Sequence, residues 1–490
     1  MSAGAQSSYE VVIGLEVHTQ LRTESKMFCA CRVRYGDPPN HHTCPVCLAL
    51  PGALPVLNAR AVEFGVRTAL AANCTVHPRS VFARKNYFYP DLPKGYQISQ
   101  YEEPLATKGW IEIDGEEPDG RSFAKRIGIT RIHMEEDAGK SIHEATESGR
   151  NGSYVDLNRA GVPLLEIVSE PDLRSAAEAG AYLRTLRQLL RYVDVSDADM
   201  EKGHFRCDAN VSLRKRGVQE FGIRNEIKNV NSFRYVEDAI RSEIERQARV
   251  LDAGGRIIQA TRLYDPSSGK TRVMRTKENA DDYRYFPDPD LVPLALEPAF
   301  VERTRLTLPE LPERRRIRFE SEHGLSAYDA RLLSTSRSLA DFFEAVVAGG
   351  VPAKTVANWI LRDVLKVLKE REQEIEDTKL SANALAGLLR LLEAGRVTAK
   401  SARDLLPELV ERGGDPAELV SARGLEAVSD HAQIERAADE VIAANPENAQ
   451  RFRAGEEKIL NFLMGQVMKK TGGKASPGVV RDILARKLKG

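Results

Sequence analysis

The chain has 490 residues, which is too long for one ordinary hydrophobic core, so we expect two or three domains. Lysine plus arginine and aspartate plus glutamate each number 71, so no overall basic charge marks a nucleic-acid-binding protein. No stretch approaches the roughly 20 apolar residues of a membrane span, and residues 1–8 lack the basic and apolar regions of an export signal. We therefore expect a soluble, cytoplasmic protein with no membrane partner.

The first expected element is a strand, because apolar and polar residues alternate from residue 11 onward. Its apolar face consists of Val11, Ile13, Leu15 and Val17. Glu16 and His18 lie on the other face, about 6–7 Å apart along the backbone, so both side chains can reach a common point. This pair either lines a cavity or is exposed to solvent, which is the commoner place for both residue types.

Four cysteines follow in two close pairs, Cys29 with Cys31 and Cys44 with Cys47. Thiolates bind zinc tetrahedrally, and two short cysteine turns from separate segments can close such a site. The pattern therefore predicts a structural zinc knuckle. The alternative is that the four thiols are unrelated. A catalytic zinc is not expected, because four cysteine ligands would leave no open position for water. His41 or His42, which lie between the two pairs, could replace one cysteine at the metal.

Acidic residues cluster at the end of a second expected strand, where Glu135, Glu136 and Asp137 are adjacent. Three neighbouring like charges are costly unless solvent or a cation compensates them, and carboxylate oxygens suit Mg²⁺. Glu166 interrupts an apolar run over residues 162–168, so its charge requires a partner in the fold.

Another strand with one polar face is expected over residues 207–214, where Asp208 and Asn210 alternate with apolar residues. This polar row could line the same cavity as Glu16. Residues 84–100, which include Lys85, are rich in Tyr, Lys, Asn and Gln. That composition suits a nucleotide or a tRNA 3′ end, although tyrosines also pack long loops.

Strands and helices are mixed up to about residue 295 without regular alternation, which favours an α+β fold with a mainly antiparallel sheet. Helices are expected over residues 176–192 and from Ser232 to the pair Gly254-Gly255. Beyond a proline-containing linker, helical patterns dominate, for example over residues 330–348 and 357–372.

We therefore expect three domains, with residues 1–295 followed by an all-α domain over 296–400 and a small helical tail domain over 401–490. The end of the chain is basic, because residues 451–490 contain ten Lys or Arg against three Asp or Glu, including Lys469, Lys470 and Lys474. Such a segment either meets a phosphate backbone or forms a solvated helical face.

Several motifs are typical of one family. They are Tyr9–His18, Leu50–Asn58, Arg84–Gln100, His133–Asp137, Asn158–Val168, Arg206–Asn210 and Asp282–Pro287. Over nearly its whole length the chain resembles the B subunits of the tRNA-dependent aspartyl/glutamyl amidotransferases. Such subunits help to make Gln-tRNA or Asn-tRNA from mischarged Glu-tRNA or Asp-tRNA.

The resemblance implies a role for each matching residue. Glu16, His18, Glu135 and Glu166 would be catalytic and hold Mg²⁺, while Lys85, Glu136, Asp208 and Asn210 would contact ATP. Residues 1–295 would form a catalytic cradle with the zinc knuckle, and the tail would bind tRNA. ATP would phosphorylate the side-chain carboxylate of the aminoacyl group. An amidase partner, the A subunit, would supply ammonia from glutamine, with a small C subunit joining the two larger subunits.

Two other functions remain open at this point. The chain could be a non-catalytic, zinc-stabilised scaffold that binds tRNA, with its acidic cluster only solvated. It could also be an ATP-dependent ligase that acts on a free amino acid, in which case tRNA would be dispensable; the basic end of the chain argues against that function.

Overall fold

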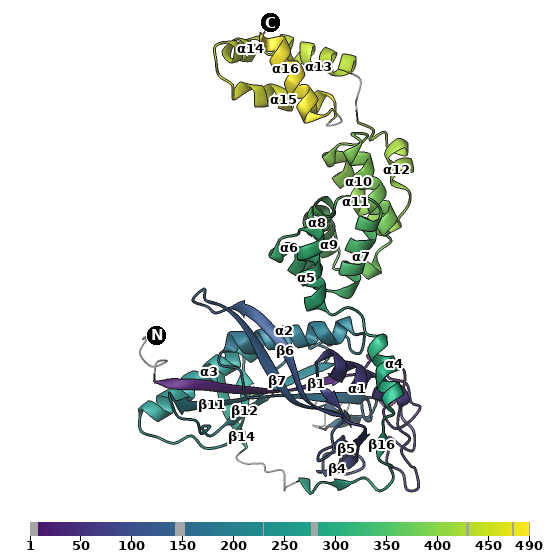
Figure 1. Ribbon diagram of the computed structural model, residues 1–490, viewed down its shortest axis with the longest axis vertical. Helices are drawn as coiled ribbons and strands as arrows, with labels where there is room; N and C mark the ends of the chain where they lie inside the picture. Colours follow the sequence, from purple (N-terminus) through teal and green to yellow (C-terminus); the bar gives the residue numbers. More distant parts are fainter. Residues whose placement is uncertain are drawn as a thin grey trace. The chain divides into compact units, whose positions relative to one another are not determined.

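The computed structural model describes residues 8–142, 152–228, 230–275, 283–427, 431–472 and 475–489. The chain divides into two compact units, Met1–Leu311 and Pro312–Gly490. A large sheet with helices forms the first unit, and the second is built of helices (Figure 1). The α+β fold predicted from the sequence is confirmed.

A nine-stranded sheet forms the frame of the first unit. Its spatial order is β14 (Lys270–Arg275), β13 (Thr261–Asp265), β12 (Asn225–Lys228), β11 (Phe205–Lys215), β1 (Tyr9–Gln20), β10 (Pro163–Ser169), β7 (Ser122–Glu136), β6 (Ala106–Glu116) and β2 (Thr75–Val76). Neighbouring strands are antiparallel except β12 with β13. Because β1 is central, its side chains meet those of β10 on one side and β11 on the other.

The register of these strands gathers polar residues from distant parts of the sequence. Ile13, Leu15 and Val17 of β1 are fully buried in the core, so the predicted apolar face is confirmed. Residues paired across antiparallel strands share a face of the sheet. His18 is therefore beside Glu166, and Glu166 is beside a residue of β7, His133.

Three helices cover the apolar face of the sheet: α1 (Ala59–Ala71), α2 (Ala176–Tyr192) and α3 (Phe233–Asp252) (Figure 1). The N-termini of these helices are capped by Asn58, Ser175 and Ser232, whose side chains accept hydrogen bonds from backbone N–H groups of the first turn. α2 and α3 are the two helices predicted for this part of the chain. The apolar residues of these helices pack with Ile13, Leu15 and Val17 of β1 in one core. The polar face of the sheet is therefore the face that the helices do not cover.

Smaller sheets flank the large one. β15 (Phe286–Pro287), β4 (Phe82–Asn86) and β5 (Tyr96–Gln100) form one, β16 (Leu294–Ala295) pairs with β3 (Arg79–Ser80), and β8 (Lys140–Ile142) pairs with β9 (Tyr154–Asp156). Arg84 stabilises the sheet of β15, β4 and β5, because its guanidinium donates hydrogen bonds to Asp288 and Asp290 at 2.8 Å each. The segment after residue 283 is thereby held against the 84–100 loop.

We expect Gly109→Ala in β6 to destabilise the first unit strongly. A β-carbon there would overlap Cys74 Sγ and lie 2.7 Å from the Ala72 carbonyl oxygen, which backbone geometry holds in place. Denaturant titration should show a loss of about 2–4 kcal/mol in the free energy of unfolding. Gly14→Ala in β1 is the control, because its β-carbon would meet nothing closer than 3.8 Å. Equal stability of the two variants would contradict this packing.

The second unit contains only short helices among its described residues. They are α5 (Pro312–His323), α6 (Ala327–Leu333), α7 (Arg337–Ala348), α8 (Ala353–Trp359), α9 (Leu365–Glu370), α10 (Ala382–Glu393), α11 (Ala399–Arg412), α12 (Pro416–Ala422), α13 (His431–Ala444), α14 (Pro446–Arg453), α15 (Ile459–Lys470) and α16 (Pro477–Lys489). A π turn, Ile360–Val364, joins α8 to α9, and a 3-10 turn, Ile375–Asp377, precedes α10. One hydrophobic cluster involves α5 to α12 and another α13 to α16.

The predicted domain limits differ from these units. Helix α4 (Pro298–Leu306) packs on α1, and Phe300 and Val301 contact the first core, so the first unit continues past residue 295 to Leu311. The predicted limit at residue 400 falls inside α11, whose apolar side chains belong to the second cluster. Tertiary packing, which sequence composition does not reveal, sets both limits.

Two predicted helices are interrupted. The helix predicted over residues 330–348 consists of parts of α6 and α7, because Ser336 caps α7 by accepting the Leu339 N–H at 3.2 Å. The helix predicted over residues 357–372 begins earlier, as α8, and includes the π turn before α9. Among the described residues, no helix is long and apolar enough to cross a membrane.

Candidate functional site

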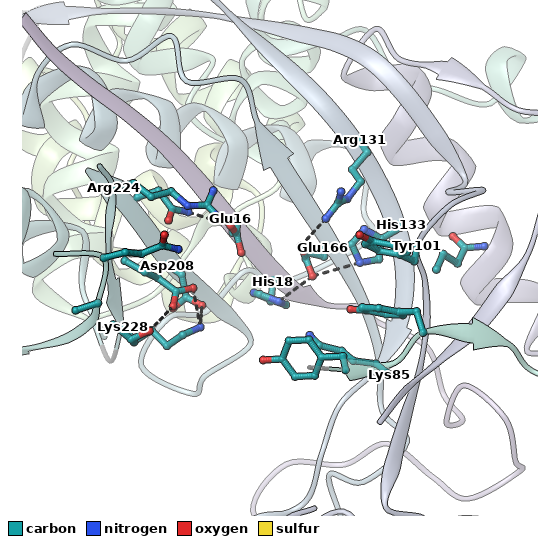
Figure 2. A pocket seen from close by; sticks show the side chains of 18 residues that line it. Glu16, His18, Lys85, Tyr101, Arg131, His133, Glu166, Asp208, Arg224 and Lys228 are labelled. Atoms are coloured by element: carbon teal, nitrogen blue, oxygen red, sulfur yellow. Dashed lines mark hydrogen bonds and ion pairs between the residues drawn. The ribbon is translucent and has the colours of Figure 1, made fainter. Parts of the chain in front are cut away.

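A cavity of about 250 Å³ opens on the polar face of the large sheet (Figure 2). Six residues predicted from the sequence line it: Glu16, His18, Lys85, Glu166, Asp208 and Asn210. They come from β1, β4, β10 and β11, and residues of β5, β7, β12, β13 and neighbouring loops, including 283–285, complete the walls. Glu135 lies behind this surface, in contact with His18.

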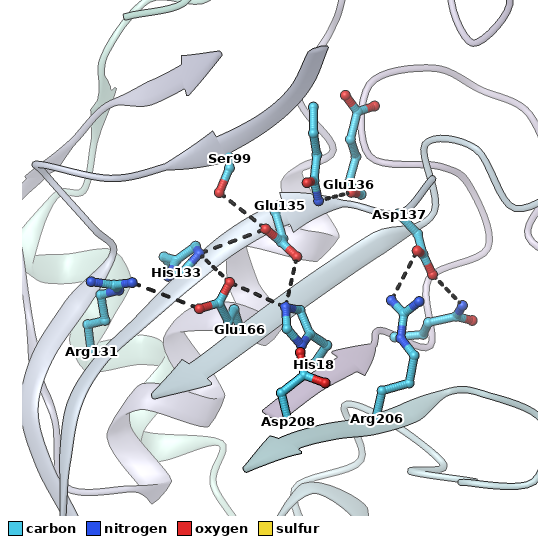
Figure 3. A network of polar contacts seen from close by, with 12 residues as sticks. His18, Ser99, Arg131, His133, Glu135, Glu136, Asp137, Glu166, Arg206 and Asp208 are labelled. Atoms are coloured by element: carbon cyan, nitrogen blue, oxygen red, sulfur yellow. Dashed lines mark hydrogen bonds and ion pairs between the residues drawn. The ribbon is translucent and has the colours of Figure 1, made fainter. Parts of the chain in front are cut away.

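His18, Glu135 and Glu166 meet at one wall of the cavity (Figure 3). His18 Nε2 lies 3.3 Å from Glu166 Oε2 and 3.6 Å from Glu135 Oε1, and the two carboxylates are only 9% and 2% exposed. Buried carboxylates this close to each other need a cation. Two carboxylates and one imidazole can hold Mg²⁺ and leave about half of an octahedral shell open for water and phosphate.

The charges of these three residues are strongly coupled. Burial disfavours the charged form of His18, but the hydrogen bond and charge of Glu166, with the charge of Glu135, raise the His18 pKa to about 9. Burial also opposes ionisation of Glu166, yet His133 and His18 hold the Glu166 pKa well below its ordinary value. Without a metal, the proton on His18 therefore supplies the positive charge that a bound cation would provide.

Glu16 lies outside this group of three residues. It accepts a hydrogen bond from Asn210 Nδ2 at 2.9 Å, one pleat away from His18 on the same face. Asp208 accepts from Lys228 Nζ at 2.7 Å. The structure thus brings together three of the four predicted magnesium ligands. Glu16 and Asp208 belong to a second wall of the cavity (Figure 2), together with Asn210, which is hydrogen-bonded to Glu16.

Lys85 and several tyrosines form the opposite side of the cavity. Lys85 Nζ lies 4.9 Å from the centre of the Tyr283 ring. Tyr101 and Tyr285 are stacked, with ring centres 4.2 Å apart and planes 7° from parallel. A lysine beside aromatic faces suits a phosphate next to a base. Asp282, at the start of the predicted motif, lies outside the described residues.

Glu136 points away from the cavity (Figure 3). Successive strand residues alternate between faces, so Glu135 lies on the face of β7 that carries His133, and Glu136 lies on the other face. Its carboxylate pairs with Lys94 and accepts the Ile98 N–H at 2.9 Å. The structure therefore does not bring Glu136 to the nucleotide site predicted for it.

The four cysteines of the predicted zinc knuckle converge, and all are free of disulfides. Cys47 Sγ lies 3.8 Å from Cys44 Sγ and 4.0 Å from Cys31 Sγ. In a tetrahedral site with Zn–S bonds of about 2.3 Å, neighbouring sulfurs are separated by about 3.8 Å, so these cysteines fit zinc. His42 pairs instead with Asp37 at 2.6 Å, and neither it nor His41 joins the cysteine group.

A fully buried lysine connects this knuckle to the segment before β10. Lys26 Nζ donates to the His42 carbonyl oxygen at 2.7 Å and to the Leu157 carbonyl oxygen at 3.1 Å. Asn158 Nδ2 adds a bond of 2.7 Å to the Pro38 carbonyl oxygen. Residues 157–163 lead directly into β10, so the knuckle supports the strand that carries Glu166.

Sequence reasoning did not single out Arg131, His133 or Lys228, which also line the cavity. His133 Nε2 lies 3.2 Å from Glu166 Oε2. The alternation of β7 contains the signal, because Arg131 and His133 precede Glu135 at intervals of two and share its face. Lys228 carries no comparable local signal, since its place beside Asp208 depends on the pairing of β11 with β12.

Comparison with protein-family models gives two matches along the chain. Residues 11–302 match the model described as the GatB/GatE catalytic domain, and residues 341–488 match the model described as the GatB domain. The first match contains the cavity, the knuckle and all the predicted site residues.

Similar proteins match over the full length. The chain is 54% identical over 483 residues to the B subunit of the aspartyl/glutamyl-tRNA(Asn/Gln) amidotransferase of Geobacter sulfurreducens, covering 99% of this chain and 100% of that protein. It is also 54% identical to the protein of the same name in Solidesulfovibrio magneticus, over 98% of this chain and 99% of that protein. The identity to the Moorella thermoacetica protein of this name is 54%, over 98% of this chain and 100% of that protein. The chain therefore belongs to the family of aspartyl/glutamyl-tRNA(Asn/Gln) amidotransferase B subunits.

Proposed function

We propose that this chain uses ATP to phosphorylate the side-chain carboxylate of Glu-tRNA(Gln) or Asp-tRNA(Asn), and that ammonia then converts the acyl phosphate to the amide. The observation that carries this proposal is the group of half-buried His18 with buried Glu135 and Glu166 at the wall of a cavity. Family membership adds the tRNA-linked substrate, because the relatives are named for tRNA(Asn/Gln) amidotransfer.

The proposed chemistry makes a poor leaving group into a good one. A carboxylate oxygen attacks the γ-phosphorus of ATP, the bond from that phosphorus to the β–γ bridging oxygen breaks, and ADP leaves with the electron pair. Ammonia then attacks the acyl carbon, the C–N bond forms, phosphate leaves, and a proton is released. Phosphoryl transfer needs charge neutralisation and alignment, and little covalent participation by the protein.

His18, Glu135 and Glu166 would hold Mg²⁺, which neutralises phosphate charge when bound. Lys85 would contact a phosphate at the other side of the cavity, next to the stacked tyrosines. Glu16, Asp208 and Asn210 would orient the nucleotide from the second wall. An acyl phosphate hydrolyses readily, so the cavity also has to keep water out during transfer.

The proposal requires partners in the cytoplasm. An amidase (glutaminase) partner, the A subunit, would release ammonia from glutamine, and a small C subunit would complete the heterotrimer. The basic end of the chain would bind the tRNA body, although part of its charge is engaged, as in the ion pairs of Lys487 with Asp439 and Lys470 with Glu440. Lys474 of this segment lies outside the described residues.

ADP release by the assembled complex tests this function. We expect ADP to form from ATP when Glu-tRNA or Asp-tRNA is present and not with the correctly charged or uncharged tRNA. ADP formed with free glutamate alone would favour the ligase that needs no tRNA. Tight tRNA binding without any ADP formation would make the chain a scaffold.

A further inference from the structure

Arg131 is less engaged than three other cations of the first unit. Arg84, Arg206 and Lys228 each donate to a carboxylate at 3.0 Å or less. The shortest ion pair of Arg131 is 3.9 Å, from its terminal nitrogen to Glu166 Oε1, which is too long for a hydrogen bond. Its Nε is buried and has no hydrogen-bond partner among the described residues.

A buried N–H without a hydrogen-bond partner is rare in folded proteins and destabilising, so such a group indicates a missing acceptor. The Arg131 side chain is 34% exposed and lines the cavity, where Figure 2 shows its guanidinium pointing toward Glu166. Glu166 turns its other oxygen, Oε2, toward His18 and His133. The Arg131 guanidinium thus lies beside the proposed magnesium ligands, and they do not use all of its hydrogen-bond donors.

We propose that Arg131 binds the side-chain carboxylate of the aminoacyl group and distinguishes this substrate from its amidated product. The inference rests on the proposed function, and it assigns Arg131 as a catalytic residue that contacts the reacting group. A guanidinium presents parallel N–H donors that match the two oxygens of a carboxylate.

Electrostatics favours a carboxylate ligand over a phosphate at this position. The attacking carboxylate must approach a site that already contains Glu135 and Glu166, so it meets like charge. Phosphate oxygens would have the metal and Lys85 as counter-charges, so the incoming carboxylate needs a cation on the Glu166 side of the cavity. Arg224, which also lines the cavity, lies next to β12 instead. Arg131, next to Glu166, supplies that charge.

The same contact explains how product is released. Amidation replaces a carboxylate oxygen by an NH₂ group, which removes the negative charge and turns an acceptor into a donor. The carbonyl oxygen of the amide still accepts one guanidinium N–H, but the NH₂ group cannot accept the other, which stays unpaired. A site that requires a carboxylate can therefore reject the amide by a large factor, as sites that require a specific hydrogen bond do.

The test compares two stable mimics of the charged tRNA end, 3′-glutamylamino-3′-deoxyadenosine and its glutaminyl equivalent, bound to the assembled complex in calorimetry. Wild type should prefer the glutamyl mimic by about 10–100-fold. Arg131→Gln should reduce this preference to about two-fold or less, and Arg131→Lys should keep part of it. With Glu-tRNA, Arg131→Gln should lower kcat/KM for ADP formation by about 100-fold.

Arg126→Gln is the matched control, because Arg126 lies on the same strand, stacks on Trp110 and pairs with Glu112 at 3.0 Å outside the cavity. It should behave like wild type. ATP affinity measured without tRNA should stay unchanged in Arg131→Gln, which also shows that the variant is folded. Retained preference for the glutamyl mimic, or loss of ATP affinity equal to the loss of activity, would overturn the inference. Absence of tRNA-dependent ADP formation by wild type would instead reject the proposed function, and the binding comparison would still decide the role of Arg131.

Discussion

Glu135→Gln should reduce tRNA-dependent ADP formation by about 1000-fold or more. Glutamine keeps the size of the side chain and can still accept the hydrogen bond that Ser99 Oγ donates to Glu135 Oε2 at 3.2 Å. It removes one of the two carboxylates that would bind Mg²⁺, and metal ions contribute several kcal/mol of transition-state stabilisation at such sites. Steady-state ADP release with Glu-tRNA, at several magnesium concentrations, measures the effect.

The loss should come with a change in metal binding and not with unfolding. A ligand that binds only the folded state stabilises it, so Mg²⁺ should raise the Tm of wild type and leave that of Glu135→Gln almost unchanged. Glu112→Gln is the control, because Glu112 is exposed on β6 and pairs with Arg126 away from the cavity. A Glu135→Gln enzyme with normal activity and normal magnesium dependence would remove this residue from the metal site.

Cys44→Ser should release the zinc of the knuckle and lower the free energy of unfolding by an amount on the order of 5 kcal/mol. Cys44 contributes one of the four converging sulfurs, and its backbone N–H lies 3.1 Å from Cys47 Sγ. Removing the metal leaves the remaining thiols close together with no cation between them. Zinc content by elemental analysis and unfolding by denaturant measure the two effects.

The knuckle variant should also impair the cavity, because Lys26 and Asn158 connect the knuckle to the segment that enters β10. Hydrogen exchange of residues 157–163 should therefore become faster in Cys44→Ser. Cys74→Ala provides the comparison, since Cys74 is buried in the first core and does not belong to the group of four cysteines. It should keep its zinc. Wild type purified without zinc, with four thiols free to react, would contradict a metal centre here.

The sequence allowed the local elements around the site to be predicted. Alternation in β1 placed Glu16 and His18 opposite a buried apolar face, and the helices predicted over residues 176–192 and from Ser232 correspond to α2 and α3. The paired cysteines predicted the knuckle. These features depend on neighbours within a few residues, where strand alternation, helix capping and metal-ligand spacing are direct consequences of covalent geometry.

Only the tertiary structure decided which side chains meet. The adjacent residues Glu135 and Glu136 have the same chemistry, but the pleat of β7 points one to His18 and the other to Lys94. Glu166 reaches His18 through the pairing of β10 with β1, across about 150 residues of sequence, and Arg131 lies next to Glu166 because β7 pairs on the other side. The sequence by itself determined the faces of the strands around the site, the ranges of two helices and the metal-binding residue types. Strand register, which long-range hydrogen bonding and core packing select, decided the composition of the site.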